Sequence, residues 1–302
     1  MTIHKYRPEV YHAVLGQFDP VLKVTDGDTV ITSTVDNAGH DASDKKVTDG
    51  INPQTGPFFI EGAEPGDTLA VHFDKMSPNR RIGRASARIA SNVVDPSYVV
   101  EMSKERVIYE WELDLDKWTA TLINPDPQLG RYVLPLSPML GCFGVAPMMN
   151  QGIAATTASN HGGNMDYNGF GADVTVYFPV FVKGALFFLG DGHAVQGDGE
   201  ITGMGIESSF DVQFTVRVVK KSINCPRAEN NEYIMTAGNA KPLDQALQQA
   251  TTEMIKWLKE DYKLGDNAVG VLLGQCVKYD IGNVYDPAYT IICKLNKKWL
   301  QR

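Results

Sequence analysis

The stretch from His161 to Glu207 holds side chains that could bind a metal ion or move protons. It contains two of the chain's six histidines and six carboxylates, namely His161, His193, Asp166, Asp173, Asp191, Asp198, Glu200 and Glu207. Glycines separate these groups, and glycine lets a backbone adopt positive φ and approach a ligand closely. Oxygen and imidazole groups presented from loops by a small apolar scaffold are a common way to build a metal site.

The densest part is GDGHAVQGDGE, residues 190–200, which contains Asp191, His193, Gln196, Asp198 and Glu200. An alternative interpretation is a pair of hairpins with Asp-Gly turns and a solvated acidic rim. The segment carries more polar groups than turns require, so we favour a functional site. Imidazole together with carboxylates favours zinc, whereas carboxylates and carbonyls alone would favour calcium or magnesium.

Two apolar runs, Val174–Val182 and Ala185–Leu189, predict β-strands within this stretch. We expect the acidic and histidine groups on the loops at the ends of these strands. A second contribution is expected from Asp36, the first polar residue after the β-branched run Thr29–Val35. The alternative for Asp36 is a polar loop with a turn at residues 37–39.

The segment LPLSPMLGCFGVAP, residues 134–147, is rich in proline and glycine and is also apolar. We expect a packed, buried loop that lines a pocket, and neither a helix nor a regular strand. Cys142 lies in this segment. A structural role for its thiol is favoured over a nucleophilic one, because no base partner can be identified.

The rest of the chain predicts a mainly β protein of two packed sheets, resembling a sandwich, with a small C-terminal α/β portion, α+β in total. Phe210–Val219 alternates as a strand does, Leu243–Tyr262 has the apolar stripe of a helix, and Tyr289–Leu295 predicts a last strand. We expect a β-rich domain over residues 1–220 that carries the active site. Residues 221–302 would form the smaller portion packed on it, or continue the same domain.

Composition excludes several classes of protein. The 302 residues carry a net charge of −8 without a basic stripe, which argues against a nucleic-acid partner. No run approaches the roughly 20 apolar residues of a membrane span, and the four scattered cysteines indicate no disulfide framework, so we expect a cytoplasmic protein. Dinucleotide-binding, P-loop and GxSxG motifs are absent.

Several segments closely resemble the acetamidase/formamidase family, from about Asp26 to Lys297. They are HGGNMDYNGF, FPVFVKGALFFLGDGHAVQGDGE, GPFFIEGAEPGDTLAVHF, LPLSPMLGCFGVAP and the later LDQALQQATTEMIKWLKE. The resemblance implies a mostly β fold and hydrolysis of the carbon–nitrogen bond of short amides to a carboxylate and ammonia. It also implies a bound divalent metal, zinc first and calcium as the alternative, and relatives that open cyclic amides such as γ-lactams.

Carried onto this chain, the family's polar positions are Asn164 and Asp166 in GGNMD and the polar residues of GDGHAVQGDGE. Glu207 and Asp36 match more loosely. The family pattern departs at Tyr167–Phe170, where many members have a basic or polar residue and leucine; this concerns the substrate more than the mechanism.

We therefore predict that Asp36, Asp166 and His193 bind the metal, with Asp191 next. His161 would be a further ligand or support one. Among the catalytic candidates, Glu200 would be the general base that passes a proton to the leaving nitrogen. Asn164, with the backbone amides of residues 162 and 163, would hold the oxyanion, and Asp198 is a third catalytic candidate.

Two rival functions remain open. One is a non-catalytic β module in which the acidic loops bind a structural calcium ion; His193 argues against it, because calcium rarely accepts imidazole. The other is the same chemistry on a lactam. The expected partner is a small amide, and we expect a homo-oligomer, most simply a dimer.

Overall fold

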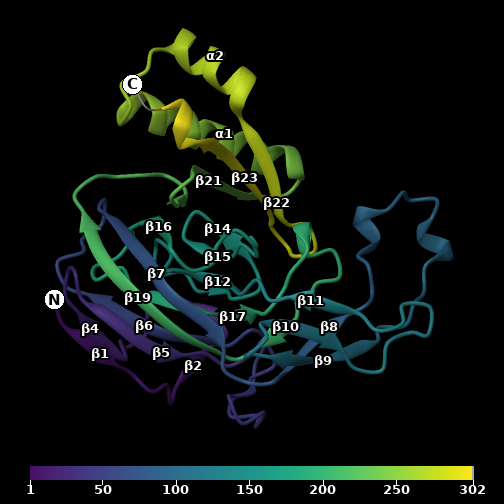
Figure 1. Ribbon diagram of the computed structural model, residues 1–302. Helices are drawn as coiled ribbons and strands as arrows, with labels where there is room; N and C mark the ends of the chain where they lie inside the picture. The colour runs from purple at the N-terminus through teal and green to yellow at the C-terminus, as the bar shows by residue number, and fades with distance from the viewer. Residues whose placement is uncertain (301–302) are drawn as a thin grey trace.

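The computed structural model describes residues 1–300, whose strands form two large sheets packed face to face (Figure 1). The first sheet has nine strands in the spatial order β1-β5-β19-β7-β16-β20-β21-β23-β22. Their bounds are Ile3–Lys5 (β1), Thr29–Ser33 (β5), Thr68–Pro78 (β7), Val174–Pro179 (β16), Phe210–Val219 (β19), Arg227–Glu229 (β20), Tyr233–Ala240 (β21), Lys278–Asn283 (β22) and Tyr289–Asn296 (β23).

The second sheet has 12 strands, nine of them in the order β11-β10-β9-β8-β18-β17-β12-β15-β14. Strand β6 pairs with β17 of this series and also with the two short strands β2 and β4. The bounds are Tyr11–His12 (β2), Leu22–Val24 (β4), Gln54–Ile60 (β6), Ile82–Ser86 (β8), Ile108–Asp114 (β9), Thr119–Leu122 (β10), Val133–Pro135 (β11), Met139–Val145 (β12), Ala158–Ser159 (β14), Gly162–Asn164 (β15), Phe187–His193 (β17) and Glu207–Ser208 (β18).

The remaining elements are short or lie at the C-terminal end. Strands β3 (Val14–Leu15) and β13 (Ile153–Ala154) pair with each other. Helix α1 (Leu243–Glu260) packs on β21 and β23, and α2 (Asp266–Cys276) follows it. Four 3₁₀ turns cover Ser91–Val93 (η1), Val99–Glu101 (η2), Asp198–Glu200 (η3) and Lys297–Trp299 (η4).

Aromatic side chains from both sheets fill the space between them. Phe73 of the first sheet meets Phe143 of the second with ring centroids 5.0 Å apart, and Phe214 meets Phe58 and Phe187, each at 5.3 Å. All five rings are fully buried. Large aromatic groups bury much apolar area and pack well edge to face, so this layer holds the two sheets together. The predicted mainly β fold of two packed sheets is confirmed.

The prediction that residues 134–147 form an irregular loop is wrong. Met139–Val145 is a fully buried strand, β12, between β17 and β15. Prolines 135, 138 and 147 lie outside the strand, and its glycines are the places where neighbouring groups approach. A Cβ on Gly144 would lie 2.4 Å from the carbonyl oxygen of His161. The proline and glycine content thus marks the ends and the close contacts of a strand.

One further prediction needs correction. Asp191 and His193 lie inside strand β17 and not on a loop at its end. The stretch after Pro78 contains strand β8, which pairs with β9. The segment between β8 and β9, with η1 and η2, extends away from the body at the right of Figure 1.

The C-terminal elements continue the first sheet. β16 pairs with β20, so the sheet passes through residue 220, and the division into domains 1–220 and 221–302 stays a prediction. The helix expected over Leu243–Tyr262 forms as α1. Of the helices within residues 1–300, none combines the length and the apolar character that crossing a membrane would require.

Candidate functional site

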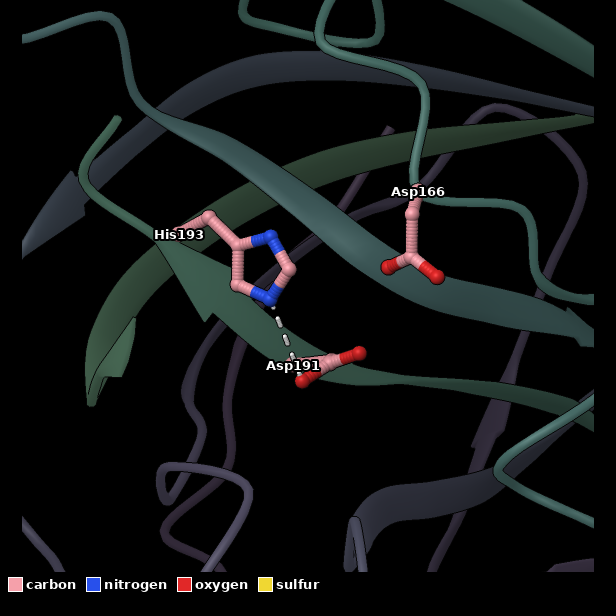
Figure 2. A group of neighbouring side chains, drawn as sticks. All are labelled: Asp166, Asp191 and His193. Carbon is pink, nitrogen blue, oxygen red and sulfur yellow. Dashed lines mark ion pairs between the residues drawn. The ribbon is translucent and has the colours of Figure 1, made fainter. Parts of the chain in front are cut away.

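Asp191 and His193 occupy alternate positions of strand β17, so their side chains share one face of the sheet. Nε2 of His193 lies 3.4 Å from Oδ1 of Asp191 and 3.0 Å from Oε1 of Glu207, which is opposite His193 on β18. Figure 2 shows Asp166, from a separate segment, facing the same space. One ligand atom each from Asp166, Asp191 and His193 lie within 4.8 Å of one another.

The orientation of the His193 ring is set by Gln196. The Nδ1 atom of His193 lies 2.8 Å from Oε1 of Gln196, while Nε2 of Gln196 donates to the carbonyl oxygen of Asp166 at 2.5 Å. Nδ1 therefore carries a hydrogen, and Nε2 faces the carboxylates. Burial alone would lower the pKa of His193, but the carboxylates of Glu207 and Asp191 raise it well above its usual value. Nε2 thus holds a proton that a cation could replace.

Two further sets of three groups extend the site. Ligand atoms of His193, Glu200 and Glu207 lie within 4.8 Å of one another, and so do those of Asp166, Glu200 and Asp286. We call the six residues Asp166, Asp191, His193, Glu200, Glu207 and Asp286 the acidic cluster. Within residues 1–300, no lysine or arginine forms an ion pair with its five carboxylates.

Burial and mutual repulsion shift the acid groups of the cluster toward their protonated forms. Burial raises the pKa of Asp166 and of Glu200 well above the usual carboxyl range. It also raises the pKa of Glu207 to about 8 and that of Asp286 to about 6. Five carboxylates in a site of low polarity are stable only if they bind protons or cations.

The donor set fits a metal ion. Two oxygens of the cluster, Oδ1 of Asp166 and Oε2 of Glu207, are buried and have no hydrogen-bond partner among residues 1–300, and Nε2 of His193 faces carboxylates. Gly141 of β12 leaves room beside them, because a Cβ there would lie 2.2 Å from Oδ1 of Asp166 and 2.8 Å from Oδ2 of Asp191. Buried carboxylate oxygens without partners, next to an imidazole nitrogen and facing a small space, are what an ion requires.

A cavity of about 220 Å³ opens onto the acidic cluster. Four carboxylates, those of Asp191, Glu200, Glu207 and Asp286, line it together with Asn52 and Asn164. Its remaining lining is Asn37, Ile51, Arg106, Thr156, Gly203 and Tyr285. A cavity of this size admits a small molecule to the carboxylates.

Asp36 and His161 do not join the acidic cluster. Oδ2 of Asp36 pairs with Arg80 at 2.8 Å, and its Oδ1 accepts hydrogen bonds from Ala38 and His40. His161 is fully buried, both of its ring nitrogens lack a hydrogen-bond partner among residues 1–300, and burial lowers its pKa to about 4. Its imidazole is therefore neutral.

The other two predicted catalytic residues take different positions. Asn164 lies within the site, where its Nδ2 donates to Oδ2 of Asp166 at 2.7 Å and to Oδ2 of Asp286 at 2.5 Å. Both hydrogens of this amide therefore contact carboxylates. Asp198 is exposed and accepts a hydrogen bond from Asn168 at 2.8 Å, outside the acidic cluster.

The sequence reasoning missed Asn52, Asn283 and Asp286. Nδ2 of Asn52 donates to Oδ2 of Asp191 at 2.9 Å and to Oδ1 of Asn164 at 2.8 Å. Asn283 ends strand β22, and Asp286 lies in the turn between β22 and β23. All three stand in the turn-like sequences GINPQ and NVYDP, so the available signal was a polar residue in a turn, which is common in any protein.

The chain matches known proteins over nearly its whole length. Residues 136–284 match the model of the acetamidase/formamidase family. The acetamidase from Yersinia enterocolitica is 31% identical, with 99% of this chain and 93% of that chain covered and a TM-score of 0.84. The chain belongs to the acetamidase/formamidase family.

Other members of this amide hydrolase family are also similar. The predicted acetamidase/formamidase from Thermoanaerobacter tengcongensis is 28% identical over 99% of this chain and 97% of that one, with a TM-score of 0.83. A putative formamidase from Schizosaccharomyces pombe is 24% identical, and the match covers 58% of this chain and only 53% of that relative's length. The matched family segment contains five residues of the acidic cluster and ends two residues before Asp286.

Proposed function

We propose that the protein is a metal-dependent hydrolase that cleaves the carbon–nitrogen bond of short linear amides of the formamide and acetamide type. The products would be a carboxylate and ammonia. Family membership supports the amide chemistry. The metal dependence rests on one observation, the convergence of Asp166, Asp191 and His193 with ligand atoms within 4.8 Å of one another.

Those three residues would hold the ion, and Glu207 is the next candidate through its unpartnered Oε2. The imidazole of His193 favours zinc, with calcium as the alternative for a site so rich in oxygen. A divalent ion bound here would polarise the substrate carbonyl and make water more acidic. Asp36, already paired with Arg80, is not part of this proposal.

Glu200 is the proposed proton carrier. Its Oε1 accepts a hydrogen bond from the backbone N–H of Gly205 at 3.0 Å, and its Oε2 accepts one from Asn283 at 3.1 Å, which fixes the carboxylate at the cavity wall. Burial raises its pKa well above the usual carboxyl range, so it binds a proton more readily than an exposed carboxylate does, as a group that accepts and then donates a proton must. It would take a proton from the water that attacks the carbonyl carbon and deliver it to the amide nitrogen as the C–N bond breaks.

Asn164 has a different role in this proposal from the oxyanion donor predicted from the sequence. Its N–H groups contact Asp166 and Asp286, so it would hold carboxylates in place. Gly162 and Gly163 lie in strand β15 between β12 and β14, where the sheet engages their backbone. Asp198 is exposed and lies outside the acidic cluster, so it has no role in the proposed mechanism.

A homodimer and a cytoplasmic location are also part of the proposal. The segment between β8 and β9 carries exposed apolar residues, with Tyr98 at 52% and Val100 at 82% exposure, which favours a contact between copies of the chain. Light scattering of purified protein tests the dimer. A monomer at all concentrations would contradict it.

The function is tested with a panel of formamide, acetamide and a γ-lactam offered to purified protein. Release of ammonia from the linear amides, with slower or no ring opening of the lactam, is the expected result. Asp166→Asn should abolish turnover while the circular dichroism spectrum stays that of the wild type. Turnover of none of the three compounds by the metal-loaded protein would contradict the proposal.

A further inference from the structure

The side-chain amide of Asn283 contacts three carboxylates of the acidic cluster. It ends strand β22 and is fully buried. Its Nδ2 atom lies 2.6 Å from Oδ2 of Asp166, 3.1 Å from Oε2 of Glu200 and 3.0 Å from Oδ2 of Asp286. One amide nitrogen from the C-terminal part of the chain therefore meets three acids at once.

The orientation of this amide is fixed by its own oxygen. Oδ1 of Asn283 accepts hydrogen bonds from the backbone N–H groups of Tyr285 at 2.7 Å and Asp286 at 2.9 Å. These bonds close the turn after β22, so the same side chain both presents its N–H groups to the acids and brings Asp286 back to the cavity. An amide held in this way cannot flip without losing both turn bonds.

Three carboxylates around one amide are not fully satisfied by it. An amide nitrogen has two hydrogens, whereas three carboxylate oxygens lie within hydrogen-bonding distance of this one. Without the amide, the like charges of Asp166, Glu200 and Asp286 would repel one another and move apart. Asn283 thus keeps their oxygens close together while leaving negative charge for a cation.

We infer that Asn283 is a positioning residue that holds Asp166, Glu200 and Asp286 at the spacing which the metal and the proton transfer require. The inference rests on the proposed function. It assigns the C-terminal portion a part in the active site, where the sequence indicated only a packed structural element. Asn283 acts through the carboxylates and is not itself assigned a contact with the substrate.

The chain offers a matched control for a purely structural asparagine. Asn239 of β21 lies in the same C-terminal portion and is also buried. Its Nδ2 donates to the carbonyl oxygen of Ser159 at 2.8 Å, and its Oδ1 accepts from Thr290 at 3.0 Å. It contacts no residue of the acidic cluster through these bonds, so its loss removes buried hydrogen bonds only.

The test compares Asn283→Ala and Asn239→Ala in the full chain. Zinc affinity is measured by competition with a chromophoric chelator, and kcat and KM are measured with acetamide. We expect Asn283→Ala to weaken zinc binding by about 10- to 100-fold and to lower kcat more than it raises KM, since groups that orient metal ligands have effects of this size. Asn239→Ala should lower Tm and leave zinc affinity unchanged. Equal zinc affinity in the two folded variants would overturn the inference.

A second variant decides the matter if Asn283→Ala does not fold. Asn283→Asp keeps the oxygen that closes the turn and replaces the N–H groups by another carboxylate. Its metal-free Tm should fall, and the rise in Tm on adding zinc should be smaller than that of the wild type, because the three carboxylates lose the N–H groups that space them and a weaker site gives less stabilisation; a rise equal to that of the wild type would overturn the inference. If the wild-type protein neither binds metal nor hydrolyses amides, the proposed function fails, and that result is distinct from either outcome.

Discussion

The Nδ1 atom of His193 lies 2.8 Å from Oε1 of Gln196, and this contact decides which ring nitrogen faces the carboxylates. Gln196 is itself held by the carbonyl oxygen of Asp166. The amide therefore connects two of the proposed metal ligands, and the ring cannot rotate while both bonds are in place.

Gln196→Ala should therefore weaken metal binding by about 10- to 100-fold, because the imidazole loses its fixed orientation. Metal affinity measured by chelator competition checks this. Gln249→Ala is the control. Gln249 accepts a hydrogen bond from the backbone N–H of Asn239, which is not a residue of the acidic cluster. Equal metal affinities of the two variants would show that Gln196 does not support the ligand.

Gly141→Ala tests the space that β12 leaves beside the carboxylates. The added methyl group would lie 2.2 Å from Oδ1 of Asp166, so either the carboxylate or the strand must move. We expect a loss of about 1–3 kcal/mol of stability together with weaker metal binding. Gly270→Ala, in helix α2 where an added Cβ would meet nothing within 4 Å beyond its chain neighbours and the helix's own backbone, should stabilise the protein slightly. Calorimetry with and without metal measures both effects. A Gly141→Ala protein that binds metal normally would contradict the geometry.

The stability of the metal-free protein should fall as pH rises. Burial raises the pKa of Glu207 from 4.5 to about 8 and that of Asp286 from 3.8 to about 6. The folded state thus binds these protons more tightly than the unfolded state does. The contribution of Glu207 to the free energy of unfolding is therefore complete below pH 4.5 and is lost as the pH rises through about 8. Bound metal would take the place of the protons.

Thermal melts of chelated and metal-loaded protein from about pH 5 to about pH 9 make the comparison. We expect the metal-free Tm to fall across this range and the metal-loaded Tm to stay level or rise. A metal-free Tm that does not change with pH would show that these acids are not forced to take up protons.

Glu200→Gln should lower kcat by about 10²- to 10⁴-fold, the usual contribution of a general acid or base. Glutamine keeps the size of the side chain and an oxygen acceptor for the N–H group of Gly205. Metal content must be measured on the same sample, because Glu200 also belongs to the acidic cluster. Normal turnover in a metal-loaded Glu200→Gln protein would remove Glu200 from the mechanism.

The local part of the site could be predicted from the sequence, and the long-range part could not. Asp191, His193 and Glu200 are close neighbours in the chain, so their density was visible. Asp36 looked equally suitable, but Arg80, 44 residues further on, occupies its carboxylate. Asn283 reaches Asp166 across 117 residues through the order of strands in the sheet, which no local pattern reports.

The fold shows the same limit. Alternation predicted β19, and the apolar stripe predicted α1, because each pattern lies within one element. Strand β12 was mistaken for a loop because Gly141 and Gly144 are there for contacts with Asp166 and His161, which belong to other segments. Glycine that serves a close approach looks the same in sequence as glycine that serves a turn.

The most direct test of metal-dependent amide hydrolysis is ammonia release from acetamide and formamide before and after chelation, with elemental analysis of the same samples. We predict that removing the metal abolishes release and that adding back one divalent ion, zinc first, restores it. Full ammonia release from protein shown to be free of metal would contradict the account.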